Sequence, residues 1–193
     1  MRTVVTPLFS FPLGDGAVLL PRTPDLLDAY QELLAANQER LARWEPWAVE
    51  LPTPEATGAN VRESARGWLA GEQVPTVIAV AAEGGWQLAG SVGLRINAYR
   101  RSADIGYWID EAHEGRGLVR RAVTALLDHA FGPLGLERVA LQTEVANLRS
   151  RALATRLGFA EEGVQRGAIA FPAERRDEVT YGILAEEWHR RNG

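Results

Sequence analysis

Two glycines two positions apart, Gly115 and Gly117, are the clearest sign of chemistry in this sequence. Glycine has no Cβ, so a loop that contains it turns tightly and brings its backbone close to a ligand. An apolar helical stripe begins near Leu118, directly after the second glycine. The first turn of that helix points unpaired N–H groups and the positive end of its dipole back at the loop. This arrangement predicts a phosphate-binding loop.

The positive charge that supports such a loop comes from arginine, because all 21 basic residues of the chain are arginines. Arg116, Arg120 and Arg121 lie in the loop or just after it. The dinucleotide-binding fingerprint requires a third glycine where Arg120 stands, and a P-loop requires Gly-Lys-Ser or Gly-Lys-Thr, so neither motif fits. Taken alone, the loop is also compatible with a glycine-rich connection that binds nothing.

The elements around the loop follow from apolar periodicity and turn signals. Before the loop, a strand is expected over 102–110, and after it a helix over 118–131. One face of that strand carries Ala103, Ile105, Tyr107 and Ile109. Thr23-Pro24 and Thr53-Pro54 are start signals for two earlier helices. The remaining expected elements are strands over 18–22, 76–82, 86–96, 139–145, 163–171 and 178–184, a helix over 147–157 that ends at Gly158, and a short terminal helix with Trp188.

This order of elements predicts an α/β (α+β) fold, in which helices pack on both faces of a mixed sheet. A chain of 193 residues, 46% of them hydrophobic, suits one domain covering residues 1–193. The net charge of −4 argues against a nucleic-acid partner, and no segment is apolar enough to cross a membrane. A cytoplasmic location is the default expectation.

Two motifs at the proper separation resemble the GNAT N-acetyltransferases, in particular the RimJ/RimL-type ribosomal-protein N-terminal acetyltransferases. The first motif is Ile105-Gly-Tyr-Trp-Ile-Asp-Glu-Ala-His113 followed by Gly115-x-Gly117, and the second is Asn147-x-x-Ser150 followed by Leu157-Gly-Phe159. The GNAT loop is commonly Gln/Arg-x-x-Gly-x-Gly/Ala. Here it reads Glu114-Gly-Arg-Gly-Leu-Val119, so its first and sixth positions depart from that pattern.

The resemblance implies a GNAT fold with a central sheet of about seven strands and a parallel pair that splays apart. It also implies that acetyl-CoA, or another acyl-CoA, places its pantetheine arm between the splayed strands. A backbone amide near Ile109 would then polarise the thioester carbonyl. The cofactor-binding residues implied are Trp108, Ile109, Asp110, Gly115, Arg116, Gly117, Leu118, Val119, Arg120 and Asn147.

The resemblance also bears on the catalytic acid. Many GNAT enzymes protonate the departing thiolate with a tyrosine at the position that Ala154 occupies here. Ser150 is then the nearest candidate acid, and Asn147 is a second catalytic candidate that is equally suited to capping the helix. No general base is evident, although Glu144 and Asp104 are within plausible reach. The sequence suggests no metal site, and His113 is expected at the surface.

Trp44 and Trp47 lie in a proline-containing connection, and the resemblance places that connection at the acceptor site. Both tryptophans are equally well explained as core residues. RimL-like proteins carry a glutamate where this chain has Ile169. That departure argues against carrying substrate specificity over from the resemblance. We expect direct acyl transfer to an amine in a ternary complex, preferably to a protein N-terminal α-amine. A small-molecule amine acceptor, a succinyl-type acyl group, a non-catalytic acyl-CoA-binding module and a homodimer all remain open.

Overall fold

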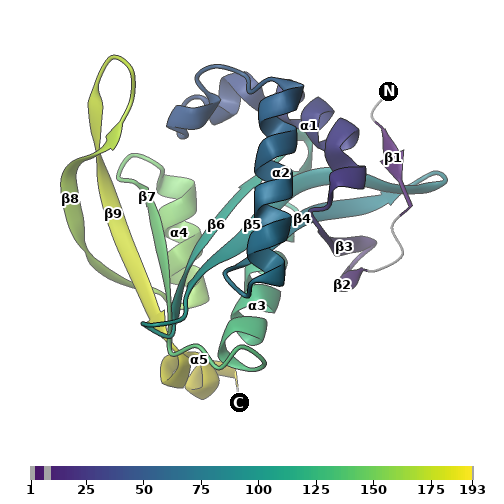
Figure 1. Ribbon diagram of the computed structural model, residues 1–193. Coiled ribbons are helices and arrows are strands. Elements are labelled where there is room, and N and C mark those ends of the chain that lie inside the picture. Colours follow the sequence, from purple (N-terminus) through teal and green to yellow (C-terminus); the bar gives the residue numbers. More distant parts are fainter. Residues whose placement is uncertain (1–2, 7–9, 193) are drawn as a thin grey trace.

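A single mixed sheet organises the computed structural model, which describes residues 3–6 and 10–192 (Figure 1). Along the sheet the strands follow the order β2-β3-β4-β5-β6-β7-β9-β8, and β1 pairs with β5. The strands are β1 Val4–Val5, β2 Phe11–Gly14, β3 Ala17–Pro21, β4 Gln73–Ala82, β5 Gly85–Asn97, β6 Ser102–Ile109, β7 Arg138–Glu144, β8 Ala160–Ala170 and β9 Arg175–Leu184. The pairs are antiparallel except for β6 and β7, which run parallel.

Helices cover both faces of this sheet, as the order of elements predicted. The α-helices are α1 Leu27–Leu41, α2 Pro54–Leu69, α3 Leu118–Phe131, α4 Leu148–Leu157 and α5 Ala185–Asn192, and the 3₁₀ turns are η1 Pro24–Leu26, η2 Pro46–Ala48 and η3 Glu111–His113. One core lies under α1 and α2, and the other lies under α3 and α4. None of the helices in the described ranges is long and apolar enough to span a membrane.

Alternate side chains of β6 point into different cores, one on each face of the sheet. Ala103 and Ile105 are buried on the face that α3 covers, and Tyr107 and Ile109 pack against the same core. Trp108 packs on the opposite face, where its ring lies 6.2 Å from that of Tyr30 on α1. The strand predicted from the alternation is therefore confirmed, and it carries side chains to both faces of the sheet.

The sheet has nine strands in the described residues, two more than expected. The additional strands, β1 and β2, are four residues or fewer and lack a long alternating pattern, which explains why periodicity missed them. Thr23 precedes a 3₁₀ turn, and its side chain makes no capping hydrogen bond. Thr53, in contrast, accepts a hydrogen bond from the N–H of Ala56 at 3.2 Å, as a capping residue should.

The helix α4 is fixed at both ends by the residues that the sequence indicated. The side chain of Asn147 accepts a hydrogen bond from the N–H of Ser150 at 3.2 Å. At the other end Gly158 adopts φ 96°, in the left-handed region where a residue with a Cβ is strained. Because Asn147 is the N-cap of α4 and Ser150 lies in its first turn, the two ends of this helix set the position of both candidate catalytic residues.

We expect Gly158→Ala to lower the free energy of unfolding by about 1–2 kcal/mol, the cost of a side chain in the left-handed conformation. Urea unfolding measures this. Gly106→Ala is the matched control, because its φ is ordinary and a Cβ there would meet no described atom within 4 Å. An equal loss in both variants would show that the left-handed cap does not determine the stability of α4.

Candidate active site

The parallel pair β6–β7 separates after a short paired segment. Backbone pairing joins Ser102 to Arg138, Ala103 to Val139 and Asp104 to Ala140, and it extends no further. Beyond that point β6 continues to Ile109 bonded to β5, and β7 continues to Glu144 bonded to β9. The expected splay is therefore present, and Figure 1 shows the ribbons of β6 and β7 diverging from their paired ends.

The separation leaves polar backbone groups on one edge of β6 without a strand partner. The N–H of Asp110 bonds to Ala89 of β5 at 2.7 Å. Because backbone groups alternate along a strand, those of Ile109 and Tyr107 point the other way, into the gap. The carbonyl of Ile109 accepts a hydrogen bond from Arg40 of α1. The N–H groups of this edge can donate to a ligand that enters the gap.

The glycine loop lies at the open end of the gap, between η3 and α3. Gly115 and Gly117 adopt φ 72° and 70°, so both need the conformational freedom that only glycine has. A Cβ at Gly115 would meet no described atom within 4 Å, and one at Gly117 would meet only Arg121, at 3.8 Å. The backbone of the loop is thus open to a ligand rather than packed against other residues.

The first turn of α3 supplies the amides that the sequence predicted. Arg121 is the first residue whose N–H bonds to a helix carbonyl, that of Gly117 at 3.1 Å. The N–H groups of Leu118, Val119 and Arg120 precede it and therefore have no carbonyl within the helix. Three amides at a helix N-terminus, beside an open glycine loop, form a site suited to a diphosphate.

The arginines near the loop divide into two groups. Arg116 and Arg120 are exposed at the loop, where they can reach an anion. Arg121 instead forms an ion pair with Asp15 at 3.2 Å and donates to the carbonyl of Arg116 at 3.4 Å. Arg121 therefore braces the loop against the β2–β3 turn.

Glu114, the acidic residue at the first motif position, joins two helices across the mouth of the gap. Its carboxylate pairs with Arg40 of α1 at 2.5 Å and with Arg149 of α4. The two guanidinium groups balance a negative charge that would otherwise repel a phosphate. This pairing accounts for an acidic residue beside a phosphate loop, and it places Arg149 next to the loop as an additional cation.

Asp110 is buried, and its carboxylate makes internal hydrogen bonds. It accepts from the side-chain amide of Asn37 at 2.9 Å and bonds to Nδ1 of His113 at 2.8 Å. Asn37 also accepts from the N–H of Glu111, at 3.2 Å. These contacts fix the start of the loop to α1, so Asp110 would support cofactor binding by holding the loop. The surface position expected for His113 is wrong, because its ring is buried beside this carboxylate.

Ser150 lies in the first turn of α4 and faces the gap through a contact with β6. The hydroxyl of Tyr107 lies 2.9 Å from the Ser150 hydroxyl, so the pair links the two sides of the splay. Burial raises the pKa of Tyr107 to about 12, and the hydrogen bond with Ser150 opposes that effect. Tyr107 belongs to the first sequence motif, but nothing in the sequence indicates a role for its hydroxyl.

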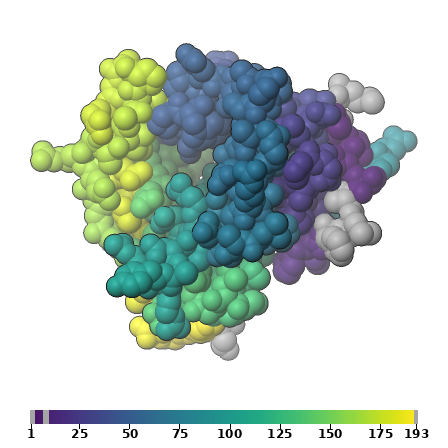
Figure 2. Space-filling model, viewed as in Figure 1, coloured from purple at the N-terminus to yellow at the C-terminus, as the bar shows by residue number. Residues whose placement is uncertain are grey.

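The opposite face of the sheet is open between α2 and the β8–β9 strands. Figure 2 shows the surface hollowed there, below the connection from α1 to α2. That connection is tied to β9, because Arg176 donates to the carbonyl of Arg43 at 2.7 Å. Trp44 is partly buried in it, and Trp47 is exposed and donates to Glu45 at 2.9 Å. Trp47 is therefore not a core residue, which was the alternative explanation for both tryptophans.

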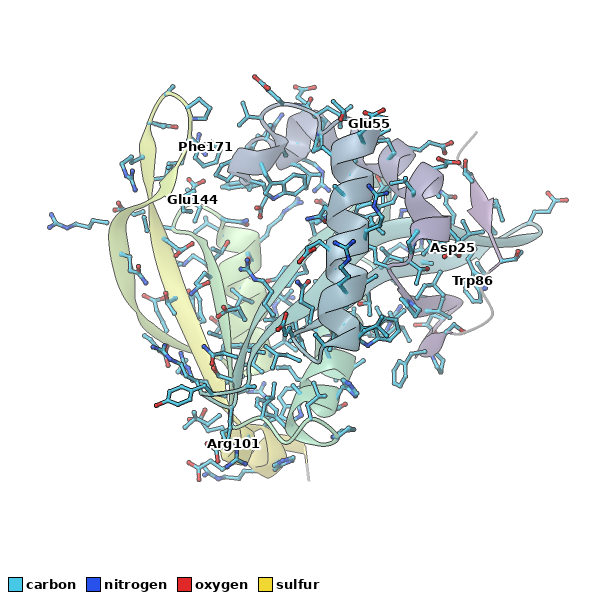
Figure 3. The ribbon with its side chains drawn as sticks, viewed as in Figure 1. Asp25, Glu55, Trp86, Arg101, Glu144 and Phe171 are labelled. Carbon is cyan, nitrogen blue, oxygen red and sulfur yellow. The ribbon has the colours of Figure 1, made fainter. Side chains whose placement is uncertain are left out.

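Carboxylates gather on this open face of the sheet. Glu144 pairs with Arg176 at 3.0 Å, and Figure 3 shows Glu144 near Phe171 of the β8–β9 hairpin. Burial raises the pKa of Glu45, and the hydrogen bond from Trp47 opposes that effect. Burial also raises the pKa of Glu178, to which the negative charge of Asp104 adds. Glu45 and Glu178 thus hold protons more readily than ordinary glutamates.

Comparison with known proteins agrees with this geometry. The family described as "Acetyltransferase (GNAT) domain" matches residues 18–160. The Bacillus subtilis (strain 168) protein YdaF, provisionally named a ribosomal N-acetyltransferase, is 32% identical over 182 residues, which are 94% of this chain and 98% of YdaF.

Two solved structures show the same fold. Mycobacterium smegmatis RimJ in complex with a CoA disulfide is 27% identical with a TM-score of 0.79, and the match covers 98% of this chain and 93% of RimJ. The RimL ribosomal L7/L12 α-N-protein acetyltransferase in complex with coenzyme A has a TM-score of 0.84, and the match covers 91% of this chain and 98% of RimL. At 22% identity, RimL is evidence for the fold alone. The family model matches most of this chain, and YdaF is similar to it over nearly the whole length of both proteins. The chain therefore belongs to the GNAT acetyltransferase family and is an N-acetyltransferase.

Proposed function

We propose that the protein transfers the acetyl group of acetyl-CoA to the N-terminal α-amine of a protein, with a ribosomal protein as the acceptor. The observation that carries the proposal is the splay of β6 from β7 beside the open loop of Gly115 and Gly117. The name of YdaF supports the acceptor class. A ribosomal acceptor would place the reaction in the cytoplasm.

The loop and the first turn of α3 suit the diphosphate of CoA, and the edge of β6 suits its pantetheine arm. The diphosphate would bind the amides of Leu118, Val119 and Arg120, with charge from Arg116 and Arg120. The pantetheine amides would hydrogen-bond to the edge of β6 in place of a strand. The N–H of Ile109 lies on this edge, where it can polarise the thioester carbonyl.

Transfer then needs a direct attack. The amine lone pair forms a bond to the carbonyl carbon, the C–S bond breaks, and its electron pair leaves with sulfur. The amine gives up one proton and the sulfur gains one, so the products are an amide and a free thiol. We assign Ser150 as the donor that stabilises the leaving sulfur, with Asn147 holding the first turn of α4.

The open face supports a protein acceptor. The hollow between α2 and β9 is accessible from solvent, as an extended N-terminal peptide requires (Figure 2). An α-amine has a pKa of about 7.7–8.0, so a larger share of it is neutral near pH 7 than of a lysine side chain. Glu45 and Glu178, whose pKa values are raised, are suited to attract an ammonium group and accept its proton. Trp44 and Trp47 would wall the acceptor site.

We expect peptides that carry the N-terminal sequences of ribosomal proteins and a free α-amine to release CoA thiol from acetyl-CoA faster than the same peptides with a blocked N-terminus. A thiol-reactive dye follows the release, and mass spectrometry locates the acetyl group. A panel of polyamines, amino acids and aminoglycosides, each tested also with succinyl-CoA, is the comparison. Turnover confined to small amines would overturn the acceptor, and CoA binding without turnover on any amine would overturn the enzymatic function.

We expect Ser150→Ala to lower kcat about 100-fold, the lower end of what a positioned proton donor contributes, with little change in the Kd of CoA. Steady-state kinetics and calorimetric titration measure the two quantities. Ser102→Ala is a matched control, because Ser102 lies on β6 where that strand is still paired to β7. A Ser150→Ala variant with unchanged kcat would remove Ser150 from the mechanism.

Gly117→Ala should weaken CoA binding about tenfold, because a Cβ disfavours φ 70° by about 1–2 kcal/mol and the free loop relaxes to another conformation that CoA binding must reverse. Gly135→Ala is the control, since Gly135 has φ 59° and open surroundings but lies beyond the far end of α3. Only Gly117→Ala should lose affinity in calorimetry, whereas Gly135→Ala should bind CoA as tightly as the wild type, whatever stability it loses in urea. Equal CoA affinity in the two variants would contradict the assignment of the loop.

A further inference from the structure

Tyr107 and Ser150 join the two sides of the gap by their side chains. Tyr107 comes from β6, three residues beyond the last pairing with β7, and Ser150 comes from α4, which follows β7. Their oxygens lie 2.9 Å apart. A group held between the parted strands at the level of Tyr107 therefore lies next to this pair of hydroxyls.

A serine hydroxyl has one hydrogen to donate and two lone pairs that accept. The N–H of Ser150 is already bonded to Asn147, which fixes the backbone but leaves the hydroxyl to rotate. With the Tyr107 hydroxyl as donor, Ser150 accepts on one side and points its own hydrogen elsewhere. With Ser150 as donor to Tyr107, its hydrogen is used up within the pair.

A leaving thiolate decides between these two arrangements. If Tyr107 donates to Ser150 and Ser150 donates to sulfur, all three groups are satisfied and the negative charge receives a hydrogen bond. With the sulfur beside Ser150, as assigned above, the opposite arrangement turns a lone pair of Ser150 towards the negative charge. We propose that Tyr107 is a positioning residue that orients the Ser150 hydroxyl towards the sulfur of the departing CoA. This inference rests on the acyl-transfer function proposed above.

Tyr107 acts through Ser150 and keeps its own proton. Burial raises the pKa of its phenol to about 12, whereas an ordinary thiol has a pKa of about 8.5. The thiolate is therefore too weak a base to remove the phenolic proton. The phenol stays a hydrogen-bond donor throughout the pH range in which the thiol ionises. Ala154 occupies the position on α4 at which many GNAT enzymes carry the tyrosine that serves the leaving group. In this chain Tyr107 would serve the leaving group instead, through Ser150.

The test measures the pKa of the CoA thiol when CoA is bound to the full-length protein. The ultraviolet absorbance of the thiolate reports its ionisation, and no acceptor amine is needed. We expect bound CoA to ionise at lower pH in the wild type than in Tyr107→Phe. Ser150→Ala should raise the thiol pKa at least as far, and the double variant should match Ser150→Ala. In the kinetic assay, Tyr107→Phe should lower kcat about tenfold with the KM for acetyl-CoA within about twofold.

Tyr181→Phe is the matched control. The Tyr181 hydroxyl also contacts α4, where it accepts from Arg151 at 3.0 Å, and it donates to Glu161 at 2.9 Å. This control should leave the thiol pKa and kcat unchanged. A Tyr107→Phe variant with the wild-type thiol pKa, or an effect of Tyr107→Phe that persists in full in the Ser150→Ala background, would overturn the inference. A wild type that binds no CoA would overturn the proposed function. A lowered thiol pKa together with turnover on small amines but not on ribosomal peptides would overturn the acceptor alone.

Discussion

Unpaired backbone groups between two parting strands are the constraint on which the rest of this structure depends. A buried N–H or C=O without a partner costs free energy, so a sheet that opens must satisfy its edges in another way. In this protein β7 leaves β6 after Asp104 and stays paired with β9. The exposed edge of β6 is therefore a binding surface for amides and carbonyls, and the ends of the gap determine what binds there.

The elements at the gap are held by contacts between residues far apart in sequence. From α1, Arg40 bonds to the carbonyl of Ile109 and to Glu114, and Asn37 bonds to Asp110. From α4, Arg149 reaches the same Glu114. These contacts hold the loop in place before a ligand arrives, and a loop that is already ordered loses less entropy on binding. The loop glycines supply the remaining requirement, which is space for the diphosphate.

Local patterns in the sequence predicted most of the fold. The alternation over 102–110 and the apolar stripe over 118–131 predicted β6 and α3 almost to the residue, and Asn147 and Gly158 predicted the ends of α4. The short strands at the N-terminus are stabilised by pairing with neighbours, and no local pattern marks such strands. The splay was implied by resemblance to a family, since nothing in the composition of β6 or β7 indicates where pairing ends.

The candidate site was predicted less completely, because its contacts cross the fold. Asn37 and Arg40 lie on a helix about 70 residues before the loop that they hold, and spacing alone could not connect them. His113 was expected at the surface because a loop histidine is usually polar and exposed, yet Asp110 gives it a buried partner. Tyr107 was one member of an alternating face, and only the three-dimensional structure places its hydroxyl beside Ser150.

Residue-resolved amide hydrogen exchange, with and without CoA, tests the central claim most directly. If the diphosphate and the pantetheine arm bind as inferred, CoA will slow exchange at Leu118, Val119 and Arg120 and at Ile109, whose N–H faces the gap. The N–H of Asp110, already bonded to β5, will change little. Slowed exchange elsewhere, with these amides unaffected, would contradict the account.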